Sequence, residues 1–258
     1  MKTGLIYTGM ILILIFGSCE NSDINFTYNR TDTMAEGLNG SGTGGSMARF
    51  TIVGDQLYTV DGYTLKTFDL TDRNKITLKS SWQMDWSGGI ETIFPYHNKL
   101  FLGTTTGMHI IDISNPDQPQ YTSKYEHVVS CDPVVVSGNY AYVTLSSGSN
   151  WCNRSVNQLQ VINISNITNP KLERTYNMNN PKGLGTDDGL LFVCDNGLKV
   201  FKKNSATDLV HINTFTDING AYDVIPYNGL LILISTDGLR QYLYENDNLT
   251  LISSILTN

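Results

Sequence analysis

Five charged residues stand at similar places along the chain, each just before or at the start of a short apolar run: Arg49, Glu91, Asp132, Lys182 and Asp223. If these runs are strands around one opening, three carboxylates and two cations meet there. Such a set could bind a sugar, a cation or a charged peptide end. The same residues could instead form compensating ion pairs and strand caps that close a narrow channel. We prefer this second interpretation, because duplication of a repeat would itself copy charges to such positions, and we keep the first as the candidate ligand site.

The carboxylates also permit a catalytic alternative. Glu91 would be the general acid of a glycan-cleaving enzyme and Asp132 or Asp223 its base, since glycoside hydrolysis uses two carboxyl groups that flank the scissile bond. No stronger motif accompanies them, because the sequence has no GxSxG elbow, Walker A loop, DxDxDG loop or sialidase Asp-box. We therefore favour a non-enzymatic protein without a cofactor and keep catalysis as the alternative.

The apolar runs that would position these charges belong to a unit that recurs five times. Each unit has a leading apolar run, a second run that opens at a first anchor, a third run that opens at a second anchor, and a fourth run. The first anchors are Leu57, Leu100, Tyr140, Leu190 and Leu230, and the second anchors are Leu65, Met108, Leu159, Leu198 and Leu239. Seventeen residues after the second anchors come Trp82, Tyr125, Tyr176 and Phe215, with Ile255 or Leu256 in the fifth unit.

Four short strands in a unit of about 40 residues are the signature of propeller blades. The sequence therefore predicts an all-β fold, a five-bladed β-propeller of four-stranded antiparallel blades. A blade cannot bury both of its faces alone, so we expect the blades to stack into a closed ring. An open sandwich of the same strands is the alternative. The propeller would span residues 47–258, in units at about 47–89, 90–131, 132–182, 183–221 and 222–258.

Two segments, GMHIIDISNPDQP and LQVINISNITNP, resemble the repeats of LVIVD-repeat proteins, a propeller-forming family of bacterial exported proteins and lipoproteins. The resemblance is clear in the second and third units. It weakens in the fourth and fifth, where FKKNS and YLYEN lack the Asp-Ile-Ser core. The family implies a fold and a location, and it implies no particular activity.

Propeller topology brings two cysteines within reach of each other. The loop that enters the inner strand of a blade and the loop between its second and third strands open on the same face. Cys131 precedes the inner strand of the third unit, and Cys152 lies in an insertion over residues 146–157. We expect a Cys131–Cys152 disulfide in an oxidising compartment, with free thiols or another pairing as the alternative. Cys194 ends an apolar run and is expected to be a small buried side chain.

The N-terminus has the layout of a signal peptide over residues 1–18. One lysine is followed by an apolar run from Leu5 to Phe16 and by small residues. Small residues directly before Cys19 resemble the lipobox of bacterial lipoproteins, which implies cleavage there and lipid on Cys19. The acidic residues that follow resemble the export signals of surface lipoproteins in Bacteroidetes-type bacteria. An ordinary signal peptide is the alternative to this membrane anchor.

Residues 19–46 are polar and end in GLNGSGTGGS, the composition of a flexible tether. Residues 24–28, INFTY, could instead add a strand that closes the propeller. We expect the domain to be lipid-anchored in the outer membrane of a Gram-negative bacterium and to face either the periplasm or the surface.

Charge and histidine placement exclude two further classes of function. The net charge is −7 and no cluster of Lys or Arg occurs, which argues against nucleic acid as a partner. The histidines have neither an HExxH motif nor paired cysteine spacing, so no metal site is expected; they are His97, His109, His127 and His211. The expected function is a non-catalytic binding or scaffold module for a protein or glycan partner.

Overall fold

The structure is a computed structural model that describes residues 44–72, 74–84, 88–127, 133–147, 156–187, 189–245 and 248–257. All of them belong to one compact unit, Gly37–Asn258. Its strands are β1 (Phe50–Val53), β2 (Gln56–Asp61), β3 (Thr64–Asp69), β4 (Thr77–Gln83), β5 (Ile90–Tyr96), β6 (Lys99–Thr104), β7 (Gly107–Asp112), β8 (Gln120–Glu126), β9 (Val134–Ser137), β10 (Tyr140–Leu145), β11 (Gln158–Asn163), β12 (Lys171–Asn177), β13 (Pro181–Asp187), β14 (Leu190–Asp195), β15 (Leu198–Lys203), β16 (Leu209–Phe215), β17 (Ala221–Tyr227), β18 (Leu230–Ser235), β19 (Gly238–Glu245) and β20 (Asn248–Leu256).

The strands form five antiparallel sheets of four, each built from consecutive strands. We call them blades 1 to 5, from β1–β4 to β17–β20. This confirms the predicted five-bladed propeller of four-stranded blades. None of the described residues forms a helix that could cross a bilayer.

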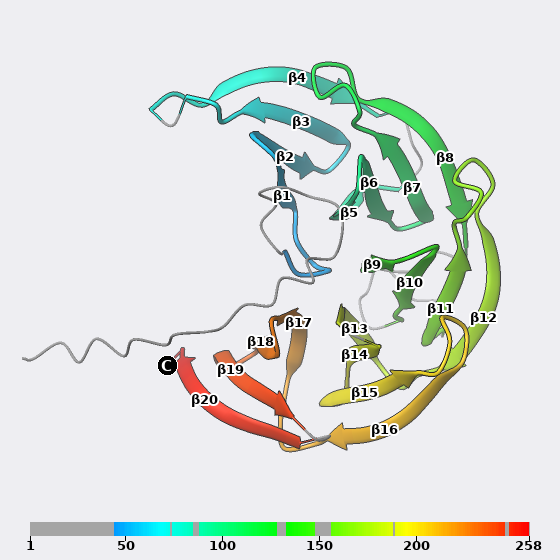
Figure 1. Ribbon diagram of the computed structural model, residues 1–258, viewed down its shortest axis with the longest axis vertical. Coiled ribbons are helices and arrows are strands. Elements are labelled where there is room, and N and C mark those ends of the chain that lie inside the picture. The colour runs from blue at the N-terminus through cyan, green and yellow to red at the C-terminus, as the bar shows by residue number, and fades with distance from the viewer. Residues whose placement is uncertain are drawn as a thin grey trace, which may run out of the picture. The chain divides into compact units, whose positions relative to one another are not determined.

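The blades follow one another around an axis, with the first strand of each blade innermost (Figure 1). Inner strands pack against the next blade from β1 to β5, β5 to β9, β9 to β13 and β13 to β17. Among the described residues no comparable strand packing joins blade 5 to blade 1, and Figure 1 shows an opening between β20 and β4. The stack is therefore open on one side, where we had expected a closed ring.

The hydrophobic core consists of four clusters, and each lies between two consecutive blades. The second anchors explain this arrangement. Leu65, Met108, Leu159 and Leu198 are fully buried, and each faces the following blade. The seventeen-residue spacing is also explained, because the anchor and the later residue are direct cross-strand partners, as in Leu198 and Phe215.

The first anchors are less regular than the sequence suggested. Ala141, Leu191 and Leu231 occupy the position of Leu100, so the anchors chosen at Tyr140, Leu190 and Leu230 lie one residue too early. Because side chains alternate along a strand, one residue changes the face on which a side chain lies.

The Asp-x-Ser pattern of the repeats has a structural role at the end of the third strand. The side-chain oxygen of Asp69 accepts hydrogen bonds from the backbone N and the hydroxyl of Thr71, at 2.9 and 2.6 Å. Asp112 accepts from the backbone of Ser114, and Asn163 accepts from that of Ser165. These bonds replace ladder partners where the chain turns. The repeat motif therefore stabilises the turn after the third strand in blades 1 to 3.

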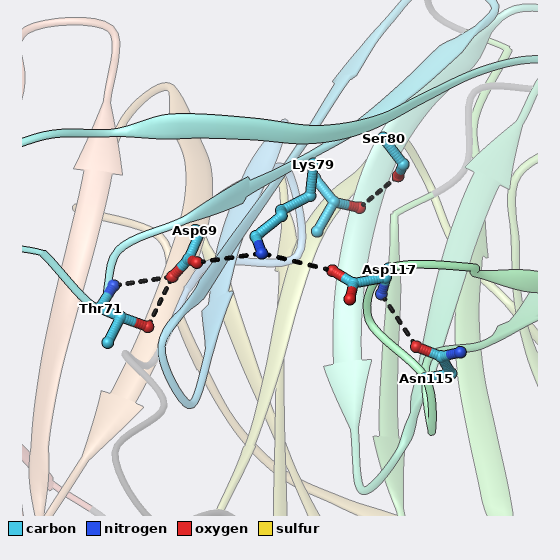
Figure 2. Close-up of polar contacts among 7 residues, drawn as sticks. Asp69, Thr71, Lys79, Ser80, Asn115 and Asp117 are labelled. Carbon is cyan, nitrogen blue, oxygen red and sulfur yellow. Dashed lines mark hydrogen bonds and ion pairs between the residues drawn. The ribbon is translucent and has the colours of Figure 1, made fainter.

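The same turns help to join neighbouring blades. In Figure 2, Lys79 of β4 extends between Asp69 of its own blade and Asp117, which follows β7 in blade 2. Its Nζ lies 3.3 Å from Asp69 and 3.8 Å from Asp117. The outer strand of blade 2 makes a similar link to blade 3, because the Ser123 hydroxyl donates to the carbonyl of Ile167 at 2.5 Å. Outer strands therefore contact the third-strand turn of the next blade.

Candidate functional site

Four of the five charged residues are described, and they lie in different environments. Arg49 precedes β1 and is exposed, while Glu91 in β5 is half-buried. Lys182 is half-buried in β13, and its Nζ lies 5.8 Å from the centre of the Tyr222 ring. Asp223 in β17 is 3% exposed. Asp132 lies outside the described residues.

The placement of Lys182 differs from the sequence analysis. β13 begins at Pro181, so Lys182 belongs to blade 4 and not to the unit 132–182. The next residue, Gly183, lies directly against blade 5: a Cβ there would be 2.7 Å from the Cα of Asp223. Glycine is therefore required for the start of β13 to approach β17 this closely.

Asp223 holds the segment before β1, residues 44–49, which we call the strap. One carboxylate oxygen accepts from the Ser46 hydroxyl at 2.9 Å and from the backbone N of Val224 at 3.0 Å. The other accepts from the backbone N of Met47 at 3.2 Å. The Ser46 oxygen in turn accepts from the backbone N of Leu184 in β13, at 2.8 Å. One buried carboxylate thus connects the strap to blades 4 and 5.

The strap also reaches blade 2, because the carbonyl of Ala48 accepts from the backbone N of Ile93 at 2.9 Å. Sequence reasoning assigned Gly45 and Ser46 to the flexible tether, but both are buried. A Cβ at Gly45 would be 2.1 Å from the Asp223 carboxylate, so this glycine allows close packing. Composition alone could not separate this role from that of a linker.

Burial raises the pKa of Asp223 to about 6, although its hydrogen bonds partly oppose the shift. No Lys or Arg in the described part of the chain lies within ion-pair distance of it. Both carboxylate oxygens are used by the protein itself. The arrangement therefore serves to attach the strap.

The raised pKa predicts a specific pH dependence of stability. The folded protein holds the Asp223 proton more tightly than the unfolded chain between about pH 4 and pH 6, so stability from this group falls as the pH rises through that window. Urea titrations at several pH values give the unfolding free energy of the wild type and of Asp223→Asn. The wild-type value minus the variant value should fall by roughly 2–3 kcal/mol between pH 4 and pH 7. A difference that does not change with pH would contradict this assignment.

Sequence reasoning missed a second buried carboxylate, Asp195, at the end of β14. It is fully buried and accepts from the backbone N of Asn179 and from that of Asn180, the latter at 2.6 Å. Lys199 Nζ lies 2.6 Å from it. The only sequence signal was a charged residue that ends an apolar run. Asp195 fixes the connection between β12 and β13.

The expectation for Cys194 is confirmed, because its side chain is fully buried between blades 4 and 5. Burial raises the pKa of its thiol. The expected lipid site Cys19 and the expected disulfide between Cys131 and Cys152 lie outside the described residues. No group of three or more potential metal ligands occurs among the residues that the structure describes.

The side of blade 5 that faces the opening differs from the same side of every other blade. We call the face of a blade that lies toward the next blade in the chain its trailing face. On this face the second anchor and its cross-strand partners on the two neighbouring strands form a row, which we call the trailing row. In blade 4 this row is Cys194, Leu198 and Phe215, of which the first two are 0% exposed. The trailing row of blade 5 is Ile234, Leu239 and Ile255, which are 37%, 37% and 71% exposed.

Comparison with known proteins supports the fold. The LVIVD repeat family model matches residues 100–127 and 130–178, which are parts of blades 2 and 3. A crystal structure of a protein from Lactobacillus plantarum is similar at 16% identity and a TM-score of 0.62, over 80% of this chain and 74% of that chain. A putative 6-phosphogluconolactonase from Bacteroides fragilis is similar at 13% identity and 0.62, over 81% and 70%. The periplasmic gluconolactonase PpgL from Pseudomonas aeruginosa is similar at 12% identity and 0.60, over 79% and 68%.

No curated protein matches the sequence. At these identities the solved structures establish a shared fold only. The family match falls on the two blades in which the Asp-x-Ser type of turn was clearest, and the five blades extend the same architecture around it. The chain is a five-bladed β-propeller, and its second and third blades match the LVIVD repeat.

Proposed function

We propose that this protein is an exported propeller, lipid-anchored at Cys19 in an outer membrane, that acts as a non-catalytic binding or scaffold module for a protein partner. The observation that carries the proposal is the exposed trailing row of blade 5. The second anchor, which the other four blades bury fully, is 37% exposed here beside the exposed Ile234 and Ile255, and contiguous exposed apolar surface marks sites of protein interaction. A glycan partner would instead call for convergent polar groups around a pocket.

The catalytic alternative has less support. It needs Glu91 as the acid with Asp132 or Asp223 as the base. Asp223 is buried, and its two oxygens already accept hydrogen bonds from Ser46, Met47 and Val224. A base must be able to reach a proton on the substrate or on water. Gluconolactonases among the similar structures share the fold at 12–13% identity, and a likeness at that level carries the fold and not the activity.

Site-specific photocrosslinking of the full chain in cells tests the proposal. A photoreactive residue at Leu239 should give a defined adduct with one protein. The matched control is Leu172 in β12, which is 45% exposed and belongs to blade 3, away from the opening. Loss of the adduct in Cys19→Ser would show that lipid anchoring brings the two proteins together. Absence of any adduct, or hydrolysis of a glycan panel that Glu91→Gln abolishes, would overturn the proposal.

A further inference from the structure

We propose that the opening between blades 5 and 1 docks a β-blade of a separate polypeptide, a four-stranded antiparallel sheet with an apolar face toward each neighbour. This inference rests on the proposed binding function and identifies the surface and the kind of partner. The trailing row of blade 5 forms one wall of the docking surface. The other wall belongs to blade 1.

The face of each blade toward the preceding one, its leading face, shows the same contrast on the other side of the opening. In blade 2, Leu100 and its cross-strand partner Ile111 are 0% exposed, because they pack against blade 1. The equivalent pairs in blades 3 to 5 are also buried. In blade 1 the equivalent pair, Leu57 and Phe68, is only half-buried. Both walls of the opening are therefore apolar faces without the cover that their repeats receive.

The occupant must present two apolar faces of opposite sense. One face has to pack on the trailing row of blade 5, as the leading face of a following blade would. The other face has to pack on Leu57 and Phe68 of blade 1, as the trailing face of a preceding blade would. A blade has both faces, as blades 2, 3 and 4 show at each of their interfaces. An amphipathic helix has one apolar stripe and would cover only one wall.

The internal interfaces show what such docking requires at the rim. Apolar rows fill the middle of all four interfaces, and at the first three of them a polar contact links the outer strand of one blade to the third-strand turn of the next. In blade 3, the Tyr176 hydroxyl donates to the carbonyl of Thr207 in blade 4 at 2.6 Å. In blade 5 the corresponding outer strand is β20, which borders the opening (Figure 1). The docking surface thus continues an interface that already occurs four times in this chain.

A second copy of this chain fits less well. It would offer its own blade 1 with four more blades attached, and such head-to-tail contacts propagate as open assemblies.

A tethered probe tests whether the trailing face accepts a blade. A copy of residues 84–127, which contains blade 2 and its natural connection, is appended after Asn258 of the full chain. The added blade should raise the melting temperature by about 5 °C or more and reduce binding of a dye that reports exposed apolar surface. The matched control carries Leu100→Asp and Ile111→Asp in the appended copy only, so that its leading face cannot pack. A melting temperature that stays unchanged, or that rises equally in the control, would overturn the inference.

Sedimentation velocity of the wild type tests whether a second copy of this chain fills the opening instead. A monomer at micromolar concentration is expected. A dimer or larger assembly that Leu239→Asp abolishes would show that a second copy fills the opening and would overturn the inference. The two proposals can also fail separately. If a partner is crosslinked but the appended blade does not stabilise the protein, the proposed binding function holds and the docking of a blade is wrong. If the appended blade stabilises the protein but no partner is crosslinked in cells, only the proposed binding function is wrong.

Discussion

Replacing Leu198 by alanine is expected to lower the free energy of unfolding by about 2–5 kcal/mol, whereas the same change at Leu239 should lower it by less than about 1 kcal/mol. Both leucines are second anchors and sit at the same position of the third strand in their blades. Leu198 is 0% exposed between blades 4 and 5, and Leu239 is 37% exposed. Truncating a buried leucine leaves a cavity, while an exposed leucine leaves none.

Urea denaturation of both variants measures the contrast, provided that the slope of unfolding free energy against urea stays constant. Met108→Ala and Leu159→Ala serve as controls, because both side chains are fully buried second anchors. They should resemble Leu198→Ala. Equal losses at Leu198 and Leu239 would mean that the trailing face of blade 5 is covered in the isolated protein.

Replacing Lys199 by methionine is expected to lower the free energy of unfolding by about 2–4 kcal/mol. The change keeps an unbranched side chain of similar length and removes its charge, which leaves the fully buried carboxylate of Asp195 without its cation. Breaking one partner of a buried pair costs much more than removing the pair, because the remaining charge stays desolvated. Thermal or urea unfolding measures the loss.

Two comparisons separate this effect from ordinary surface electrostatics. Lys124→Met removes the cation of an exposed pair with Glu126 and should leave stability almost unchanged, because solvent screens the pair. The double variant Asp195→Asn and Lys199→Met should recover part of the loss, since no unpaired charge remains. A loss at Lys199 no larger than that at Lys124 would count against a structural role for Asp195.

The number of blades and their strands could be predicted from the sequence because the evidence is local and repeated. Each second anchor and the aromatic residue seventeen positions later are cross-strand partners, so their spacing is fixed by the hairpin that joins two strands. In the fifth blade the partner of Leu239 is Ile255, which lies one residue nearer than in the other blades.

The candidate site was less predictable because its partners are distant in sequence. Ser46 and Asp223 are 177 residues apart, and nothing local distinguishes Ser46 from the linker composition before it. The sequence is equally silent about which second anchors are exposed. Leu198 and Leu239 are the same residue type in equivalent positions, and only the presence or absence of a following blade separates them. Sequence periodicity describes a blade well, but it says little about what lies beside the last one.

Hydrogen–deuterium exchange tests the uncovered face of blade 5 most directly. Amides of β19 and β20 in the purified protein are compared with those of the equivalent strands β15 and β16 in the same experiment. If the trailing face of blade 5 lacks a neighbour, local opening is easier there, and β19 and β20 should exchange at least about tenfold faster. Equal protection of the two strand pairs would contradict an open side and, with it, the docking surface for a further blade.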